Sequence, residues 1–243
     1  MKSSPFTRRE FVRYSLMAAG YSLTAGSSLL APLVHALGKV PTKLDDGESI
    51  FTLSGKVKIN GKKASDSSII TANDTIETDS NSQLIFVVGK DAHILRENSK
   101  LILTDNTSSL EAGLQLAKGK VLSVFGKRGQ GEGSLKLKTT TATIGIRGTG
   151  VYSESHQDHS YVCTCYGQTE IASLTDPSSS EIVTTTHHDA PRYILKDGKA
   201  GSLIEAAPMK NHTDEELMII EALVGRAPPF SSLMQYNAPR RGY

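Results

Sequence analysis

Apolar and polar residues alternate in short runs through the middle of the chain, and turn-forming residues separate the runs. The clearest case spans residues 55–62, where the alternation runs into Asn60-Gly61, a pair that tolerates the positive φ of a two-residue hairpin turn. The same pattern predicts further strands at 68–70, 74–78, 82–88, 92–96, 100–103, 114–125 and 134–152. Closely spaced short strands predict a mainly β domain of stacked strands, either solenoid-like or a sandwich.

The pattern changes near residue 190. A last hairpin is predicted over Ile194–Ile204, followed by one short C-terminal helix. Thr213-Asp214-Glu215-Glu216 has the form of a capping box, Leu217–Leu223 supplies the apolar face, and Gly225 ends the helix. We expect this hairpin and helix to form an appendage that covers one end of the β stack.

The first residues have the features of a twin-arginine (Tat) export signal. Arg8-Arg9 and Phe11 precede an acid-free, weakly apolar run over 14–34, which leads to a small-residue cleavage site at Ala36. The run is a poor match to the roughly 20 strongly apolar residues of a stable membrane span. We therefore expect cleavage after Ala36, a periplasmic mature protein and no transmembrane helix in that mature chain.

These signals divide the chain into five parts: a signal peptide (1–36), a linker (37–49), the β domain (50–186), the hairpin and helix appendage (187–226) and a flexible tail (227–243). Removing the signal changes the balance from 27 basic against 25 acidic residues to 23 against 24. The mature net charge is then about −1, and no basic stripe interleaved with aromatic residues remains. We expect no nucleic-acid partner.

Residues 141–149, Thr-Ala-Thr-Ile-Gly-Ile-Arg-Gly-Thr, are the most specific motif of the chain. Together with the strands before them, they resemble the FecR-like periplasmic sensor domain over roughly residues 50–173. The specific core is Ile146-Arg147-Gly148-Thr149. Two roles are open for Arg147: its fork of donors could hold stacked strands together, which is the favoured role, or contact a ligand or partner.

The resemblance implies a signalling or interaction module without catalysis. Familiar FecR members pass a signal from an outer-membrane iron-siderophore receptor to a sigma factor, through a cytoplasmic N-terminal segment and one membrane span. This chain begins with an export signal instead of that segment. We therefore expect an exported sensor or interaction domain that binds a small ligand or a periplasmic or outer-membrane protein.

Cys163 and Cys165, the only two cysteines, stand at i and i+2 in a predicted strand. They share a face there, with β-carbons roughly 6.5–7 Å apart, whereas a disulfide needs about 3.5–4.5 Å. A shared metal is easier to accommodate. Candidate partners are His187 or His188, one of which could join the cysteines, and His212 farther on. Two thiolates with one or two imidazoles suit zinc, copper or an iron-sulfur centre.

Two other states of the cysteine pair stay open, namely a structural or redox-active disulfide, as is common in exported proteins, and free thiols. His156 and His159 lie in an acidic polar loop and are expected to be solvated. The alternative function is a periplasmic redox or metal-carrier protein that uses Cys163 and Cys165, with His187 or His188, on a FecR-like scaffold. A cysteine-histidine nucleophile is chemically conceivable, but no hydrolase or metalloprotease motif accompanies it, so we expect no enzyme.

Overall fold

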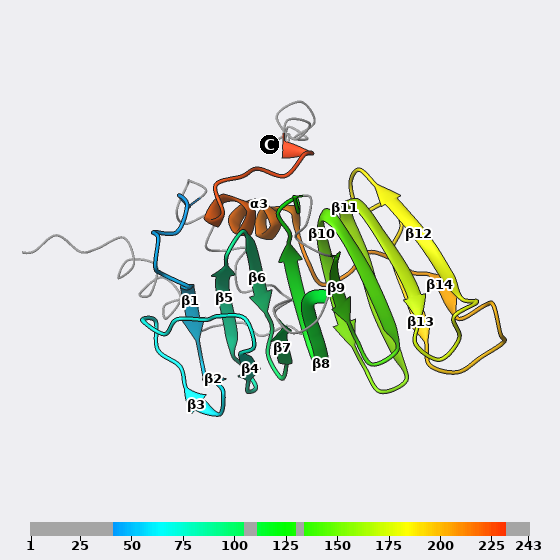
Figure 1. Cartoon of the computed structure of the whole chain (residues 1–243), viewed down its shortest axis with the longest axis horizontal. Helices are drawn as coiled ribbons and strands as arrows, with labels where there is room; N and C mark the ends of the chain where they lie inside the picture. Colours follow the sequence, from blue (N-terminus) through cyan, green and yellow to red (C-terminus); the bar gives the residue numbers. More distant parts are fainter. Residues whose placement is uncertain (1–40, 105–110, 130–133, 232–243) are drawn as a thin grey trace, which may run out of the picture.

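The computed structural model describes residues 41–104, 111–129 and 134–231 (Figure 1). The predicted export signal with Arg8, Arg9 and Phe11 lies outside the described residues, as do parts of the predicted linker and tail. Among the described helices, none is long and apolar enough to span a membrane.

The described residues form mainly β structure with one short helix, which confirms the predicted fold class. The elements are β1 (Ile50–Ser54), β2 (Val57–Ile59), β3 (Lys62–Lys63), β4 (Thr75–Thr78), β5 (Gln83–Val88), β6 (Asp91–Leu95), β7 (Lys100–Thr104), β8 (Glu111–Val124), β9 (Ser134–Lys138), β10 (Ala142–Ser155), β11 (His159–Ser173), β12 (Ser180–Thr185), β13 (Arg192–Leu195), β14 (Ile204–Ala206) and α3 (Asp214–Leu223).

The strands form one continuous 14-stranded sheet, whose two parts share the three longest strands. The later half of β8 pairs with β6 and β10, and its earlier half pairs with β7 and β9. In the same way, β11 pairs with β13 near its start and with β12 near its end. The first sheet therefore runs β1-β5-β6-β8-β10-β11-β13-β14, and the second runs β3-β2-β4-β7-β8-β9-β10-β11-β12. These two parts of the sheet form layers on either side of a shared core, and they are called the first and the second sheet here.

The main hydrophobic core lies between the two sheets. Large apolar side chains from the inner faces of both sheets are completely buried there: Leu84, Phe86, Leu95, Val121 and Val162 from the first sheet, and Ile76, Leu101, Leu116, Leu137 and Ile144 from the second. The burial of so much apolar surface is the main favourable contribution to folding.

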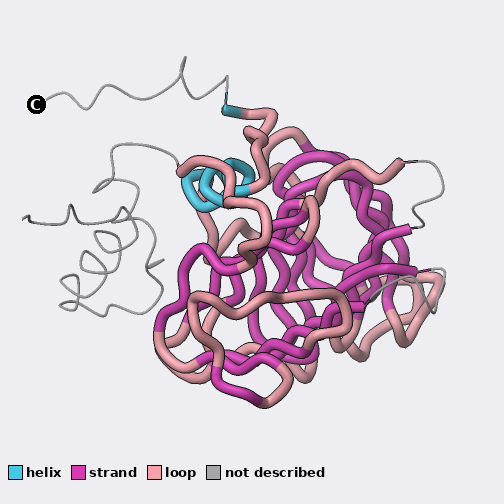
Figure 2. Tube along the Cα trace, turned by 60° about the vertical axis from the view of Figure 1, so that its left-hand side comes forward, coloured by secondary structure: helices cyan, strands magenta, loops and turns pink. Residues whose placement is uncertain are grey.

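A second apolar cluster covers the outer face of the first sheet. Its members are contributed by the sheet and by the C-terminal segment: Ile85, Ile94, Leu122, Tyr152, Tyr161, Cys163, Cys165 and Tyr166 from strands, and Leu217, Ile220, Leu223 and Phe230 from α3 and the residues after it. In Figure 2 the helix accordingly lies outside the strands. The expectation that this segment covers an end of the β stack was therefore wrong. The first sheet is apolar on both faces, and α3 buries the outer one.

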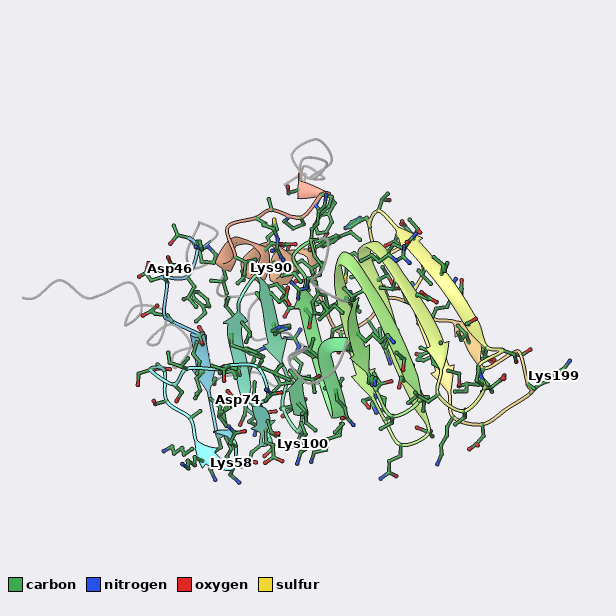
Figure 3. The ribbon with its side chains drawn as sticks, viewed as in Figure 1. Asp46, Lys58, Asp74, Lys90, Lys100 and Lys199 are labelled. Atoms are coloured by element: carbon green, nitrogen blue, oxygen red, sulfur yellow. The ribbon has the colours of Figure 1, made fainter. Side chains whose placement is uncertain are left out.

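The outer face of the second sheet has a different character. Lys58, Glu77 and Lys100 stand side by side in a cross-strand row, and the Lys100 ammonium lies 2.8 Å from a Glu77 carboxylate oxygen. Lys58 and Lys100 mark this region in Figure 3. A face built of charged residues is stable in water, so it needs no covering helix.

Local signals place the turns and the helix. Asn60 and Gly61 have φ values of 51° and 76° and connect β2 to β3, as predicted. The capping box of α3 is also confirmed, because the Thr213 hydroxyl accepts from the Glu216 N–H and the Glu216 carboxylate accepts from the Thr213 N–H. The strand predicted at 68–70 was wrong, since this segment belongs to a loop.

Candidate metal centre

Four ligand-bearing side chains meet beneath α3, on the outer face of the first sheet. They are Cys163 and Cys165 of β11, His188 of the loop between β12 and β13, and His212, two residues before α3. The sulfur and nitrogen atoms that they offer all lie within 4.8 Å of one another. Both cysteines are fully buried, and both histidines are nearly so. The structure thus brings together both cysteines and two of the three candidate histidines, His188 and His212, and leaves His187 outside the cluster.

A bulge in β11 places Cys165 and its neighbour Tyr166 on the same face as Cys163, the face toward α3. Val151 of β10 pairs with Thr164 and Gly150 pairs with Tyr166, so the register passes over Cys165. An extra residue of this kind bends the strand and redirects side chains. Cys163, Cys165 and Tyr166 consequently all join the cluster under α3. No disulfide bond joins the two cysteines in the described structure.

His188 owes its position to an unusual backbone conformation. Its φ is 54°, and its N–H donates to the Cys165 carbonyl at 2.9 Å. The turn is fixed by Asp189, whose carboxylate accepts from the N–H groups of Thr186 and His187. A non-glycine residue at positive φ is uncommon, and such residues gather at functional sites. The loop conformation aims the His188 ring at the two sulfurs.

Hydrogen bonds determine which nitrogen of each ring carries a proton. Nδ1 of His212 lies 2.7 Å from the Lys210 carbonyl oxygen, and Nε2 of His188 lies 3.0 Å from the Asp214 carboxylate. Both partners only accept, so these two nitrogens donate. The remaining nitrogens, His188 Nδ1 and His212 Nε2, face each other at 3.0 Å. In neutral rings these would be two opposed lone pairs, so the site favours a cation or proton between them.

The charges of the metal-free site follow from the same contacts. A hydrogen bond with the Cys165 thiol, helped by His188, outweighs burial and lowers the pKa of Cys163 to about 4. Burial opposes charging of His188, but hydrogen bonds to Asp214 and Cys163 raise its pKa to about 9. Burial raises the pKa of Cys165 well above its ordinary value. Without a metal, Cys163 and His188 therefore form a thiolate-imidazolium pair.

The segment before α3, residues 208–213, is called the strap here because several side chains tie it to the first sheet. The Asn211 side-chain amide donates to Glu154 at 2.7 Å, and the Lys210 ammonium lies 3.2 Å from the same carboxylate. The Lys210 ammonium also sits 4.5 Å from the centre of the Tyr161 ring. These contacts hold His212 over the sulfurs, where its ring stacks on Tyr152 at 4.6 Å.

We expect the Glu154 contacts to make the free energy of unfolding depend on pH. Burial alone would raise the pKa of Glu154, but hydrogen bonds from Asn211, His156 and Tyr152 outweigh it and lower the pKa to about 2. The carboxylate therefore stabilises the fold fully above its unfolded value near 4.5, and this contribution fades as pH falls from there toward 2.

The E154Q variant should unfold more easily than wild type by about 2–3 kcal/mol at pH 7. By pH 3 the difference should shrink to about half of that value or less. Denaturant titrations of both proteins at the two pH values measure it. A difference in stability that does not change with pH would contradict the stabilising role of the ionised Glu154 carboxylate.

The other histidines lie outside the buried cluster. His187 is 44% exposed, and its Nε2 lies 2.9 Å from Asp214 rather than beside the sulfurs. His156 and His159 stack on each other at 4.6 Å at the turn from β10 to β11. Asp214, a residue that the sequence marked only as part of the helix cap, hydrogen-bonds to both His187 and His188.

The Ile146-Arg147-Gly148-Thr149 motif shapes the strands beside the centre. Ile146 is buried, Gly148 has a φ of 60°, and the Thr149 hydroxyl donates to the Tyr166 carbonyl in the bulged part of β11. Arg147 is exposed opposite Gln168, and it forms no ion pair with any residue that the structure describes. The motif's contribution here is therefore the backbone shape and the threonine contact.

Comparisons with known proteins find a family likeness for one part of the chain. No curated protein matches it. Two crystal structures of a protein from Parabacteroides distasonis, described as a candidate anti-sigma factor, are similar at 11% identity and a TM-score of 0.46, over 56% of this chain and 60% of that one. A likeness of this size carries no argument about function.

The FecR protein family model matches residues 74–169, from just before β4 into β11. Cys163 and Cys165 fall inside the matched residues, while His188 and His212 follow them. Residues 74–169 make up most of residues 50–173, the region whose sequence resembles the FecR-like domain. Residues 74–169 of this chain are therefore similar to the FecR protein family.

Proposed function

We propose that this chain is an exported, non-catalytic sensor or interaction domain of FecR type, and that its functional centre is a metal ion bound by Cys163, Cys165, His188 and His212. The domain would bind a periplasmic or outer-membrane partner or a small ligand. The role of the metal would be to hold the strap and α3 against the FecR domain.

The observation that carries this proposal is the pair of nitrogens that face each other. His188 Nδ1 and His212 Nε2 are 3.0 Å apart, and Cys163 Sγ is 3.5 Å from His188 Nδ1. In a tetrahedral zinc shell, bonds of 2.3 Å to sulfur and 2.0–2.1 Å to nitrogen place these atoms about 3.5 Å (S to N) and about 3.4 Å (N to N) apart. A metal ion would therefore need only small movements of the side chains.

The ligand chemistry favours zinc or copper(I). Thiolates select soft or borderline ions, and imidazoles suit both metals. The compactness of the four atoms supports a single ion rather than an iron-sulfur cluster, because a cluster inserts its own sulfide atoms between the protein ligands. Four protein ligands fill a tetrahedral shell, which supports a structural or regulatory ion over a catalytic one.

The competing function is a redox or metal-carrier protein that uses the same cysteines. The thiolate-imidazolium pair of Cys163 and His188 favours it, because a thiolate is the reactive form of cysteine. Both sulfurs, however, are fully buried. Thiol exchange requires access to the sulfur, so this burial weighs toward the metal-bound sensor.

Metal analysis of the protein exported through its own signal tests the proposal. Mass spectrometry of elements should find about one equivalent of zinc or copper per chain. In a Cys163→Ala, Cys165→Ala double variant the content should fall at least 10-fold, because two of four ligands are lost. A His156→Ala, His159→Ala variant is the matched control and should keep its metal. A metal-free wild-type protein with a disulfide between the two cysteines would favour the redox alternative.

A further inference from the structure

Side-chain exposure to solvent increases stepwise from the buried cysteines through His188 and Asp214 to His187. Cys163 and Cys165 are fully buried, the His188 side chain is 5% exposed, the Asp214 side chain 17% and the His187 side chain 44%. Each of the three outer residues contacts the next, so a chain of ligand atoms connects the buried sulfurs with water.

The three outer residues form a ligand set of their own. His187 Nε2 lies 2.9 Å from both carboxylate oxygens of Asp214, and His188 Nε2 lies 3.0 Å from one of them. Neighbouring ligands in an octahedral shell with bonds of 2.1 Å are about 3.0 Å apart. Two imidazoles and one carboxylate on one side of an ion, with water on the other side, suit first-row divalent metals.

His188 belongs to both ligand sets. Its Nδ1 faces Cys163 and His212, whereas its Nε2 faces Asp214. An ion in the outer position would bind Nε2 and release the proton of that nitrogen to water. An ion in the inner position would bind Nδ1, with Nε2 again donating to Asp214. Successive occupation of the two positions therefore requires no rearrangement of the backbone.

The loss of bound water from a hydrated cation costs much free energy if protein ligands do not replace the water at once. Entry in two stages avoids this cost, because the negative Asp214 and two imidazoles replace part of the water shell first. We infer that His187, His188 and Asp214 form an outer metal position, and that ions reach the buried cysteines through it. This inference rests on the proposed function of the buried site.

Cobalt(II) separates the two positions, because only the inner one gives thiolate-to-cobalt charge-transfer absorption. The metal-free mature protein, kept reduced, is mixed rapidly with cobalt(II), and the growth of that absorption is followed. In a His187→Ala variant the rate should fall about 10-fold or more, while the final absorption stays the same.

His159→Ala is the matched control, because His159 is also partly exposed and its Nδ1 lies 2.8 Å from a neighbouring carboxylate, that of Asp158. This variant should load at the wild-type rate. A His187→Ala variant that loads as fast as wild type overturns the inference and leaves the buried site intact. If wild type itself develops no charge-transfer absorption, the proposed function fails, and the entry position fails with it.

Discussion

Removal of the metal is expected to lower the free energy of unfolding of the wild-type protein by several kcal/mol, on the order of 5 kcal/mol. The four ligands come from β11, from the loop after β12 and from the strap, so the ion would join three segments that are distant in sequence. Without it, a charged thiolate and an imidazolium stay buried, and the contacts between the strap and the sheet must hold α3 alone.

Guanidinium titrations with and without a chelator, in the presence of a reductant, measure this loss. Hydrogen exchange locates it: the His188 amide, which donates to Cys165, and the amides of the strap should exchange faster without metal. Amides of β4 and β7, in the second sheet, should not change. The Cys163→Ala, Cys165→Ala variant serves as control, because the chelator should leave its stability unchanged. Equal stability of wild type with and without chelator would contradict the expected role of the ion.

The second large effect concerns Gly150, the residue after the Ile146–Thr149 motif. A β-carbon on Gly150 would lie 2.5 Å from the ring of Tyr166, which is buried and cannot move freely. The Tyr166 hydroxyl donates to Glu221 of α3, so a displaced ring would also disturb the helix. We expect Gly150→Ala to destabilise the protein by about 2–3 kcal/mol.

Gly145→Ala, in the same strand, is the matched control. There the nearest atom to a new β-carbon is 3.5 Å away, an ordinary contact. This variant should lie within about 0.5 kcal/mol of wild type in the same denaturant titration. Equal stability of the two variants would contradict the expected clash between a side chain at position 150 and the Tyr166 ring.

The strands and the helix cap could be predicted because they depend on neighbours in sequence. Asn60-Gly61 and the Thr213–Glu216 capping box fix their own geometry, and the alternation of residues marks the strands. The strand predicted at 68–70 failed for an equally local reason. The Ser68 hydroxyl accepts from the Ser65 N–H, and the Asp74 carboxylate accepts from the Thr71 N–H, so polar side chains satisfy the backbone in place of a strand partner.

The centre could be predicted only in part. The spacing of the two cysteines indicated a shared metal. Which histidines lie beside them, however, depends on backbone conformations that the periodicity of the sequence does not reveal. His188 and Asn211 both adopt positive φ, and these two conformations direct the His188 and His212 rings inward. The position of α3 over a sheet face, rather than over an end, brought His212 into reach.

In the proposed function, the ion connects the residues that match the FecR family to residues beyond them. The family match ends at residue 169, and His188 and His212 lie in the segments that follow. A change in metal occupancy would therefore act on the strap and on α3, and so alter the outer face of the first sheet that a partner could contact.

X-ray absorption at the metal edge, recorded on protein exported through its own signal, is the decisive measurement for the metal centre. We expect a shell of two sulfur atoms at about 2.3 Å and two imidazole nitrogens at about 2.0–2.1 Å. A shell of nitrogen and oxygen alone, or a protein that carries no metal and joins Cys163 to Cys165, would contradict it.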